Sequence, residues 1–440
     1  MFTPKPARYR ICNSTRCPLT SFSFSFSFSF CSFSSFSSST TSFLSSTSFS
    51  PFSSSSFFLL LPLPPPPLSS HRLLWASPPS SPSSSTSSLP PFSPPMSEST
   101  PSASLKRQKP LLRHPTELRT LGFTSLFYSC LLTLWWYDTA LFSAGLPGWV
   151  VFAVLYGCLL MLSAMMAVIT HNALHVPVFH SMALQKLFQL LLTAAYGQPC
   201  SIYQPAHNRS HHRHTGTRQD LMRPTKLQYR RNWLNIALAK EHSPGPTSGL
   251  KLAWNFYRAQ WRVRRELVYT FFFELASLVV LMVAVFLISP RKSILYVYGA
   301  QTMGQAFINS INFLQHDGCE IDPAHDGFNH ARNFTGWFFN YIFLNNGYHT
   351  IHHMKPGLHW SVLPAHHQRS VAPHIHPNLE VPCFRKHLWK TMWTREDYLG
   401  RPITPGDSSR DWSLLDEAIQ FDTPVVYETD APAESKPHAE

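Results

Sequence analysis

The sequence contains three histidine-rich stretches: His171-Asn-Ala-Leu-His175, His207-Asn-Arg-Ser-His211-His212 and His349-Thr-Ile-His352-His353. A fourth element, Asn312-Phe-Leu-Gln-His316, closes the last long apolar segment. Together they supply nine imidazoles, each at or just beyond the end of a stretch long enough to cross a membrane. Neutral imidazole is a good ligand for iron, copper, zinc and nickel. Nine ligands are too many for one ion, so the sequence predicts two metals.

The spacing within these stretches indicates how their side chains would be shared. His171 and His175 lie four residues apart, so on a helix both point the same way and can bind one metal. His207 and His211 repeat this spacing, and the same pairing is expected for them. The adjacent histidines 211–212 and 352–353 point about 100° apart on a helix, which suits ligation of two different metals by one segment. A single HxxxH would be a weak signal, whereas three clusters in this order form a strong one.

Four apolar segments separate the histidine stretches, at about 121–142, 149–170, 267–288 and 294–314. Each has about 20 residues, enough at 1.5 Å per residue to cross a hydrocarbon core of about 30 Å. The loop between the first two segments is uncharged, whereas Lys and Arg flank them outside, so the positive-inside rule places both termini in the cytosol or stroma. Arg291 and Lys292 on the outer side mildly violate this rule. Four crossings bring every histidine stretch to one membrane face.

The predicted fold is therefore an all-α membrane protein with four transmembrane helices, interfacial helices and a His-rich cap on the cytosolic or stromal side. Residues 181–265 are amphipathic, which is typical of helices lying in the membrane interface. Four regions are expected: a low-complexity leader at 1–95, a basic segment at 96–120, a membrane domain at 121–376 and a polar C-terminal tail at 377–440. The Ser-rich, acid-free leader fits a transit peptide, or a gene-model extension preceding a true start at Met96.

The formal net charge is +13, while Asp, Glu, Lys and Arg make up only 13% of the residues. Such an excess suits nucleic acid, anionic lipid or an acidic protein partner. No nucleic-acid-binding motif accompanies it, so lipid and protein partners are favoured. The basic clusters at 223–231 and 258–265 are interpreted as positive-inside anchors, with docking of an acidic electron carrier as the alternative. The eight cysteines show no CxxC spacing, which argues against a zinc-thiolate site.

On its histidine stretches the chain resembles the integral-membrane desaturase and hydroxylase superfamily, over about residues 120–370. The resemblance implies a non-haem centre of two Fe ions at the ends of four membrane helices, with O2 as co-substrate. It implies the metal ligands His171, His175, His207, His211, His212, His316, His349, His352 and His353. It also implies that Asn312 acts on the metal through water. The second histidine box has three residues between its first His and the pair, and the third begins with His349 rather than Gln, which argues against the front-end desaturases.

The resemblance also implies the reaction. The reduced iron pair would use O2 to break an unactivated methylene C–H bond of a lipid, and no catalytic residue separate from the metal centre is expected. Removal of a second hydrogen gives a double bond, whereas oxygen rebound gives an alcohol. Carboxylates commonly orient the free N–H groups of ligating imidazoles. The candidates for that role are Asp220, Asp317, Asp322 and Asp326.

The expected activity is that of a fatty acid desaturase-like oxidoreductase acting on an acyl chain, in a plastid membrane or the endoplasmic reticulum. A hydroxylase or ketolase of a lipid or carotenoid is the alternative, because His353-Met-Lys-Pro and Trp360-Ser-Val-Leu-Pro also resemble carotenoid ketolases and hydroxylases. No His-Pro-Gly-Gly signature of a fused cytochrome b5 is present, so a separate carrier, ferredoxin or cytochrome b5, would supply electrons.

Two other classes are disfavoured. A zinc metalloprotease needs Glu beside the first His as general base, and here Asn172 and Asn208 stand at those positions. A metal transporter, the remote alternative, would place ligating groups near the middle of its spans. Glu274 is the notable ionisable residue at that depth, while the histidines gather at the ends.

Overall fold

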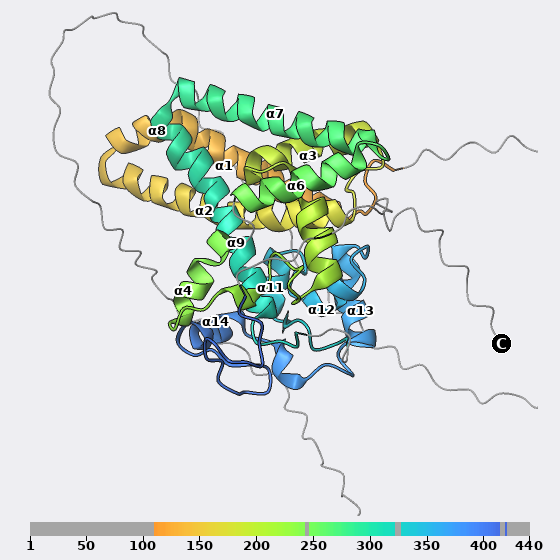
Figure 1. The fold of residues 1–440 in the computed structure, drawn as a ribbon. Coiled ribbons are helices and arrows are strands. Elements are labelled where there is room, and N and C mark those ends of the chain that lie inside the picture. Colours follow the sequence, from red (N-terminus) through yellow and green to blue (C-terminus); the bar gives the residue numbers. More distant parts are fainter. Residues whose placement is uncertain (1–109, 243–245, 322–326, 414–418, 420–440) are drawn as a thin grey trace, which may run out of the picture. The chain divides into compact units, whose positions relative to one another are not determined.

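The structure is a computed structural model that describes residues 110–242, 246–321, 327–413 and 419 (Figure 1). The leader at 1–95, most of the basic segment and the last part of the C-terminal tail lie outside the described residues. The described part is mostly helical. Its long helices are α1 (Glu117–Ser143), α2 (Gly145–His175), α3 (Met182–Tyr196), α6 (Pro246–Gln260), α7 (Arg265–Ile288) and α9 (Gly299–His316).

Shorter elements connect and cap the long helices. The short helices are α4 (Asn232–Ala237), α5 (Ala239–His242), α8 (Pro290–Lys292), α11 (Trp337–Ile342), α12 (His349–Met354), α13 (Leu363–Ser370) and α14 (Phe384–Trp393). The 3-10 segments are η1 (Cys200–Ile202), η3 (Pro224–Lys226), η5 (Trp360–Val362) and η6 (Pro377–Leu379), and the π-helices are η2 (Gln204–His212) and η4 (Ser293–Tyr298). Strand β1 (Asn333–Phe334) pairs in parallel with β2 (Glu380–Val381).

Helices α1 and α2 form a tight hairpin. Only Ala144 separates them, and Gly145 takes φ +67°, a conformation that costs glycine little. Gly148 lies directly against the Leu141 carbonyl, where a Cβ atom would collide with it. The small residues of this turn therefore allow two long apolar helices to run side by side.

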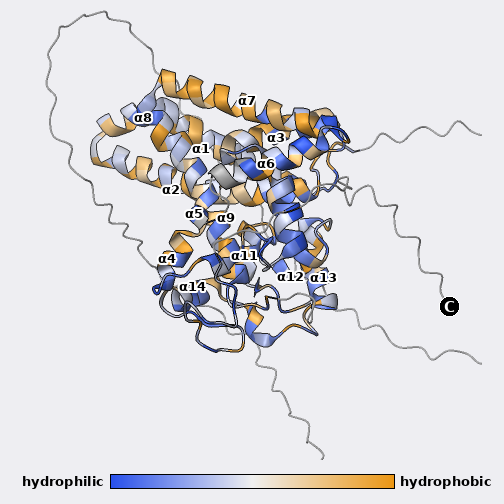
Figure 2. Ribbon diagram, in the orientation of Figure 1, coloured by the Kyte–Doolittle hydropathy of each residue, from blue (hydrophilic) through white to orange (hydrophobic). Residues whose placement is uncertain are grey.

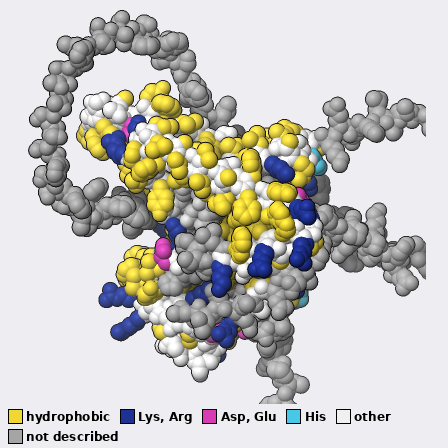
Figure 3. All heavy atoms as spheres, turned by 45° about the horizontal axis from the view of Figure 1, so that its top comes forward, with side chains coloured by type: hydrophobic (Ala, Val, Ile, Leu, Met, Phe, Trp, Pro, Cys, Tyr) yellow, Lys and Arg dark blue, Asp and Glu magenta, His cyan; other side chains and the backbone are white. Residues whose placement is uncertain are grey.

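Two helices, α2 and α7, are long and apolar enough to cross a membrane. Helix α7 turns most of its surface outward: Val280 is 69% exposed and Leu287 is 78% exposed. Hydrophobic residues dominate α7 and the neighbouring helices, and they form a broad apolar surface (Figures 2 and 3). An apolar surface of this extent is typical of contact with lipid. Helices also lie at the other two predicted spans, in α1 and in η4 with α9.

Helix α9 is more polar than a simple membrane span, and its polar side chains bind the end of α3. Gln301 Nε2 donates to the Ala194 carbonyl at 2.8 Å, and Gln305 Nε2 donates to the Tyr196 carbonyl at 2.9 Å. The last carbonyls of a helix have no partner within it and require one elsewhere, above all away from water. These glutamines therefore complete the C-terminus of α3 inside the helical layer.

Residues 377–413 belong to the same folded unit as the membrane helices. Strand β2 pairs with β1, and Asn378 Nδ2 donates to the Tyr398 carbonyl at 2.8 Å. Arg395 donates to the Asp317 carboxylate, one residue past the end of α9. The folded chain thus continues well beyond residue 376, where the sequence suggested that a polar tail begins.

Candidate metal centre

All nine predicted histidine ligands come together in two groups. Within each group, one nitrogen from every ring lies within 4.8 Å of the others. The five-histidine group contains His171, His175, His207, His212 and His352. The four-histidine group contains His211, His316, His349 and His353. Both groups receive ligands from the second and third histidine stretches, while only the five-histidine group includes the first stretch and only the four-histidine group includes His316, so the two groups form one site with two centres.

Four helix segments position these rings. His171 and His175 occupy the last turns of α2, and His316 is the last residue of α9. The second stretch lies on η2 and the third on α12. The ends of two long helices thus meet two short helices from distant parts of the chain, and six of the nine rings are buried.

The second stretch departs from the expected pairing of His207 with His211. Segment η2 is a π-helix, whose backbone bonds join residues five apart, so side chains five apart share a face. His207 and His212 accordingly lie together, with their Nε2 atoms 3.0 Å apart, while His211 belongs to the other group. The prediction that His207 and His211 share one ion is therefore wrong, because it assumed an α-helix.

The adjacent pairs behave as their angular separation predicted. His211 and His212 fall in different groups, and so do His352 and His353. On α12, His349 and His353 lie four residues apart and share the four-histidine group, with Nε2 atoms 3.1 Å apart. Each of these two segments therefore contributes ligands to both centres, so a movement of either segment would change the positions of ligands in both groups.

The spacing of the ring nitrogens fits metal ions. An ion with metal–nitrogen distances of about 2.1 Å separates neighbouring ligand nitrogens by about 3 Å. The Nε2 atoms of His316 and His349 are 2.9 Å apart, and His349 Nε2 also lies 3.1 Å from His353 Nε2. Three nitrogens converging on one point at this spacing are what ligands of a shared ion require.

Several buried ring nitrogens in these groups lack a hydrogen-bond partner. They include His175 Nε2, His211 Nε2 and His352 Nε2. A buried polar atom without a partner costs about 1–3 kcal/mol, and such atoms are rare in folded proteins. Six of the nine rings carry such an atom: His175, His207, His211, His212, His349 and His352. The partnerless atom of His207, His212 and His349 is Nδ1, on the other side of the ring from the Nε2 atom that faces a neighbouring histidine. A bound cation would satisfy the Nε2 atoms of His175, His211 and His352, so the residues present fit a metal pair.

Hydrogen bonds on the opposite ring nitrogens set the tautomer of three histidines in the four-histidine group. His211 Nδ1 lies 3.1 Å from both carboxylate oxygens of Asp220, and His316 Nδ1 lies 3.0 Å from the His330 carbonyl. His353 Nδ1 lies 3.2 Å from Thr215 Oγ1. In each case the oxygen accepts a hydrogen bond from Nδ1–H, so the lone pair of Nε2 is available to bind a metal.

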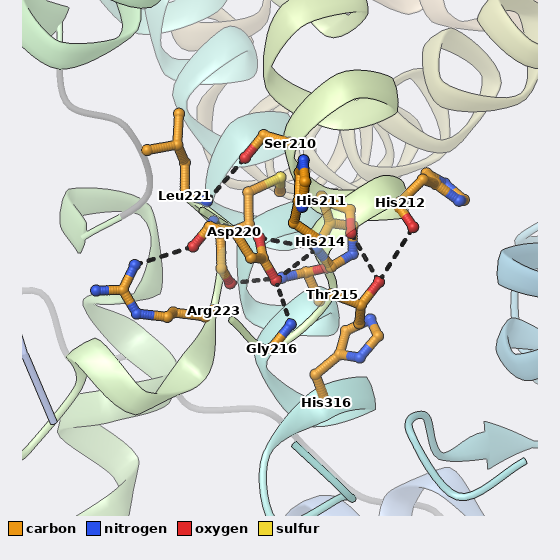
Figure 4. A network of polar contacts seen from close by, with 12 residues as sticks. Ser210, His211, His212, His214, Thr215, Gly216, Asp220, Leu221, Arg223 and His316 are labelled. Carbon is orange, nitrogen blue, oxygen red and sulfur yellow. Dashed lines mark hydrogen bonds and ion pairs between the residues drawn. The ribbon is translucent and has the colours of Figure 1, made fainter. Parts of the chain in front are cut away.

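Asp220, a predicted orienting carboxylate, is buried and held by its own loop (Figure 4). It accepts from the backbone N–H groups of Gly216 at 3.0 Å and Met222 at 2.8 Å. The His211 ring and these hydrogen bonds keep the pKa of Asp220 below its usual range despite its burial. Asp220 is therefore a carboxylate facing His211, which is the arrangement that raises the basicity of a ligating imidazole.

Asn312 connects α9 to this loop. It lies one turn before His316, and its Nδ2 donates to the Met222 carbonyl at 3.1 Å. The Met222 N–H in turn donates to Asp220, so the segment bearing His316 is tied to the carboxylate that orients His211. The predicted water-mediated contact of Asn312 with metal stays a prediction, while this structural tie is an additional role.

The other predicted carboxylates have different surroundings. Asp317 follows His316, yet its carboxylate accepts from Arg395 at 2.7 and 3.0 Å. Arg395 Nη1 also donates to the Leu227 carbonyl, so Arg395 connects the C-terminal segment both to the end of α9 and to the segment around Leu227. Asp322 and Asp326 lie outside the described residues. Asp220 is thus the predicted carboxylate that the structure places against a ring of the centre.

Burial makes the histidines of the centre poor bases. It lowers the pKa of His207, His212, His349, His352 and His353 well below the usual value for histidine, and neighbouring imidazoles lower it further. The rings are therefore neutral at physiological pH. Only the neutral ring offers a lone pair to a metal, so the electrostatics and the geometry agree.

A buried pair outside the centre was not anticipated from the sequence. His359 Nε2 lies 2.8 Å from Glu117 Oε1, and the His359 ring stacks on His114. The pair joins the start of α1 to the segment preceding η5. Nothing in the sequence signalled it, because 242 residues separate Glu117 and His359.

The comparison with protein families gives one match. A family model described as "Fatty acid desaturase" matches residues 147–382, more than half of the chain. The matched region contains all three histidine stretches and the Asn312–His316 element. No curated protein matches the sequence.

Proposed function

The chain belongs to the fatty acid desaturase family, and on that premise we propose that it is a membrane-bound, di-iron, O2-dependent oxidoreductase that introduces a double bond into a fatty acyl chain of a lipid. One observation carries this proposal: nine imidazoles, six of them buried, gather in two adjacent groups at the ends of apolar helices. Family membership and the His clusters together support an oxidoreductase with a lipid substrate in a membrane.

When bound, an iron pair supplies the oxidising power of O2 toward an unactivated methylene group. The chain's own residues perform the supporting work. The imidazoles hold two cations without adding negative charge, and Asp220 orients His211 through its Nδ1–H. Burial of the rings excludes water from their surroundings, which protects an oxidising centre from side reactions. Asn312 and Thr215 hold the loops that carry these ligands.

Hydroxylation or ketolation of a lipid or carotenoid on the same scaffold remains the alternative reaction. The ligand set is common to these chemistries, and the product depends on how the substrate methylene is held. Metal transport is disfavoured by the surroundings of Glu274, the ionisable residue within α7. Its carboxylate is engaged by Ser201 rather than directed into a pathway between helices.

Electrons would come from a separate carrier, ferredoxin in a plastid membrane or cytochrome b5 in the endoplasmic reticulum. The basic cluster at 223–231 is only partly available for docking. Arg223 and Lys226 are buried and donate to carbonyls of the loop that bears Asp220. Arg230 and Arg231 are exposed, so we propose that they contribute to a surface for an acidic carrier.

Expression of the full chain in yeast and in a cyanobacterium, followed by gas-chromatographic lipid and pigment profiling, tests the proposal. A new unsaturated acyl chain that disappears in His211→Ala would support it. A hydroxylated or ketolated product would assign the alternative reaction. Equal product from the wild type and His211→Ala would overturn the ligand assignment. His374→Ala is the matched control, because His374 is exposed, contacts the Phe328 ring and belongs to neither group.

A further inference from the structure

Helix α7 carries one buried carboxylate in an otherwise apolar sequence. Glu274 is 2% exposed, although neighbouring residues such as Phe273 face outward. Its Oε2 accepts two hydrogen bonds from Ser201, one from the backbone N–H and one from Oγ, both at 2.8 Å. Ionisable residues inside apolar membrane helices are expensive and rarely lack a role.

Ser201 is held from a second side as well. The Tyr257 hydroxyl of α6 donates to the Ser201 carbonyl at 2.8 Å. Ser201 lies in η1, and η2 begins two residues after η1 ends. Helices α6 and α7 thus both form hydrogen bonds with Ser201, which lies just before the π-helix and six positions ahead of His207.

The π-helix needs such an anchor. Helices of this kind are rare and are seen mainly as short segments at functional sites. In η2 the π geometry brings His207 and His212 onto one face. A shift of the start of η2 would move both rings relative to His171 and His175 on α2, so the geometry of the five-histidine group depends on where η2 begins.

The four-histidine group is protected from such a shift. His211 is fixed independently by Asp220, whose loop is tied to α9 through Met222 and Asn312. The other members of that group lie on α9 and α12. Loss of the Ser201 anchor would therefore disturb two of five ligands in one group and no more than one of four in the other.

We propose that Glu274 is a positioning residue for the five-histidine group, acting through Ser201 on the start of η2. This inference rests on the proposed metal-binding function. The role assigned to Glu274 is that of hydrogen-bond acceptor, so Gln should replace it and Leu should not.

Iron stoichiometry and iron release test the proposal on the purified full-length protein. Iron per chain is measured by mass spectrometry, and release to a ferrous chelator is followed over time. His175→Ala and His349→Ala identify which release phase belongs to which group. Glu274→Gln, Glu274→Leu and Ser201→Ala are compared with Glu266→Gln, a matched control on the same helix whose exposed carboxylate pairs with Arg264.

We expect Glu274→Leu to retain the four-histidine iron and to lose the other, or to release it about tenfold faster, as is usual when support of a metal ligand is removed. Glu274→Gln and Glu266→Gln should behave as the wild type. Unchanged release from Glu274→Leu, or equal acceleration of both phases, would overturn the inference. If Glu274→Leu does not insert, Glu274→Ala decides, because it also removes the acceptor of both Ser201 hydrogen bonds. Selective acceleration of the five-histidine phase in Glu274→Ala supports the inference, and no change rejects it. A wild type that binds no iron would instead overturn the proposed function itself.

Discussion

Two buried polar clusters lie at opposite ends of α2 and α9, and they differ in how completely they are satisfied. Near the α1–α2 turn, the Asp138 carboxylate accepts from Arg291 at 2.6 Å, Lys292 at 2.8 Å and the Tyr296 hydroxyl at 3.0 Å. At the other end, nine histidines come together, and six of them retain a buried nitrogen without a hydrogen-bond partner. Both clusters are polar and enclosed, yet only one is complete without a ligand.

The difference separates a structural cluster from a binding site. A buried charge is tolerated when opposite charges and hydrogen bonds surround it, as they surround Asp138. This pairing also accounts for Arg291 and Lys292, which violated the positive-inside rule in the sequence: a buried carboxylate partly neutralises them. The histidine end carries ring nitrogens whose lone pairs lack a hydrogen-bond partner, among them Nε2 of His175, His211 and His352, and a cation would satisfy these. Buried nitrogens without a hydrogen-bond partner, rather than burial alone, distinguish the candidate binding site from the structural cluster.

Removal of a histidine should have the largest effect. We expect His175→Ala to eliminate one bound iron and His349→Ala the other, with at least about a thousandfold loss of product formation in each, because both metals are needed for O2 chemistry. Iron analysis of the purified variants and lipid profiling measure the two effects. Membrane insertion should be retained, since the rings do not face lipid. A variant that keeps both irons would break the assignment of its ring to a group.

Disruption of the opposite end should weaken stability and leave metal binding intact. Asp138→Asn leaves Lys292 with an uncompensated charge near a buried site, for which we expect a loss of about 2–3 kcal/mol, below the usual range for a buried pair because Arg291 is largely exposed. Thermal unfolding of the detergent-solubilised protein measures the loss, and iron per chain should stay at the wild-type value. A loss of iron without a loss of stability would contradict the distinction between the two ends.

The gathering of the nine histidines could be predicted from the sequence because their spacing is local and their segments end apolar stretches. His171 and His175 lie on a regular α-helix, and the split of 211–212 and 352–353 follows from adjacency. The pairing of His207 with His212 could not be predicted, because no residue pattern distinguishes a π-helix from an α-helix at this site. Long-range partners were equally hidden: Arg395 lies 78 residues from Asp317.

Long-range contacts also explain why the spans were only partly predictable. Hydropathy identifies α2 and α7, which present uniform apolar surfaces. The glutamines of α9 are polar residues within a predicted span, and they donate to the carbonyls at the end of α3. Glu274 was noted as an exception in the sequence, but its partner Ser201 lies 73 residues away. A polar residue in an apolar helix indicates that a hydrogen-bond partner exists, but the sequence does not identify that partner.

Weakening the support of one ligand should have a smaller effect than removing the ligand. Asp220→Asn keeps an acceptor for His211 Nδ1 but removes the negative charge that raises the basicity of the ring. We expect iron affinity of the four-histidine group to fall about tenfold, the lower end of the usual range for such partners. Competition with a chelator measures the affinity. Asp317→Asn is the control: its carboxylate serves Arg395, so stability should change while iron affinity stays near the wild-type value.

A half-buried histidine outside both ends provides the finest test, with the smallest effect. Burial, together with Arg332 and Lys390, lowers the pKa of His387 to about 3, and its Nε2 is engaged by the Thr391 hydroxyl. Because the folded pKa lies below the unfolded value of about 6.5, the stability contribution is complete above pH 6.5 and declines as pH falls toward 3. Between pH 7 and 5.5 the decline should be about 1.3 kcal/mol.

His387→Gln should remove this part of the acid sensitivity and leave iron per chain unchanged. The measurement compares the change in unfolding free energy between pH 7 and 5.5 in the wild type and the variant, so contributions from all other histidines cancel. If the variant lost iron, a satisfied and distant imidazole would matter to the centre, and unsatisfied nitrogens would no longer distinguish ligands from structural histidines. If iron persists, a histidine whose ring nitrogen already has a hydrogen-bond partner takes no part in metal binding. His387 is as enclosed as several of the predicted ligands, so the missing hydrogen-bond partner, and not burial, is what distinguishes those ligands.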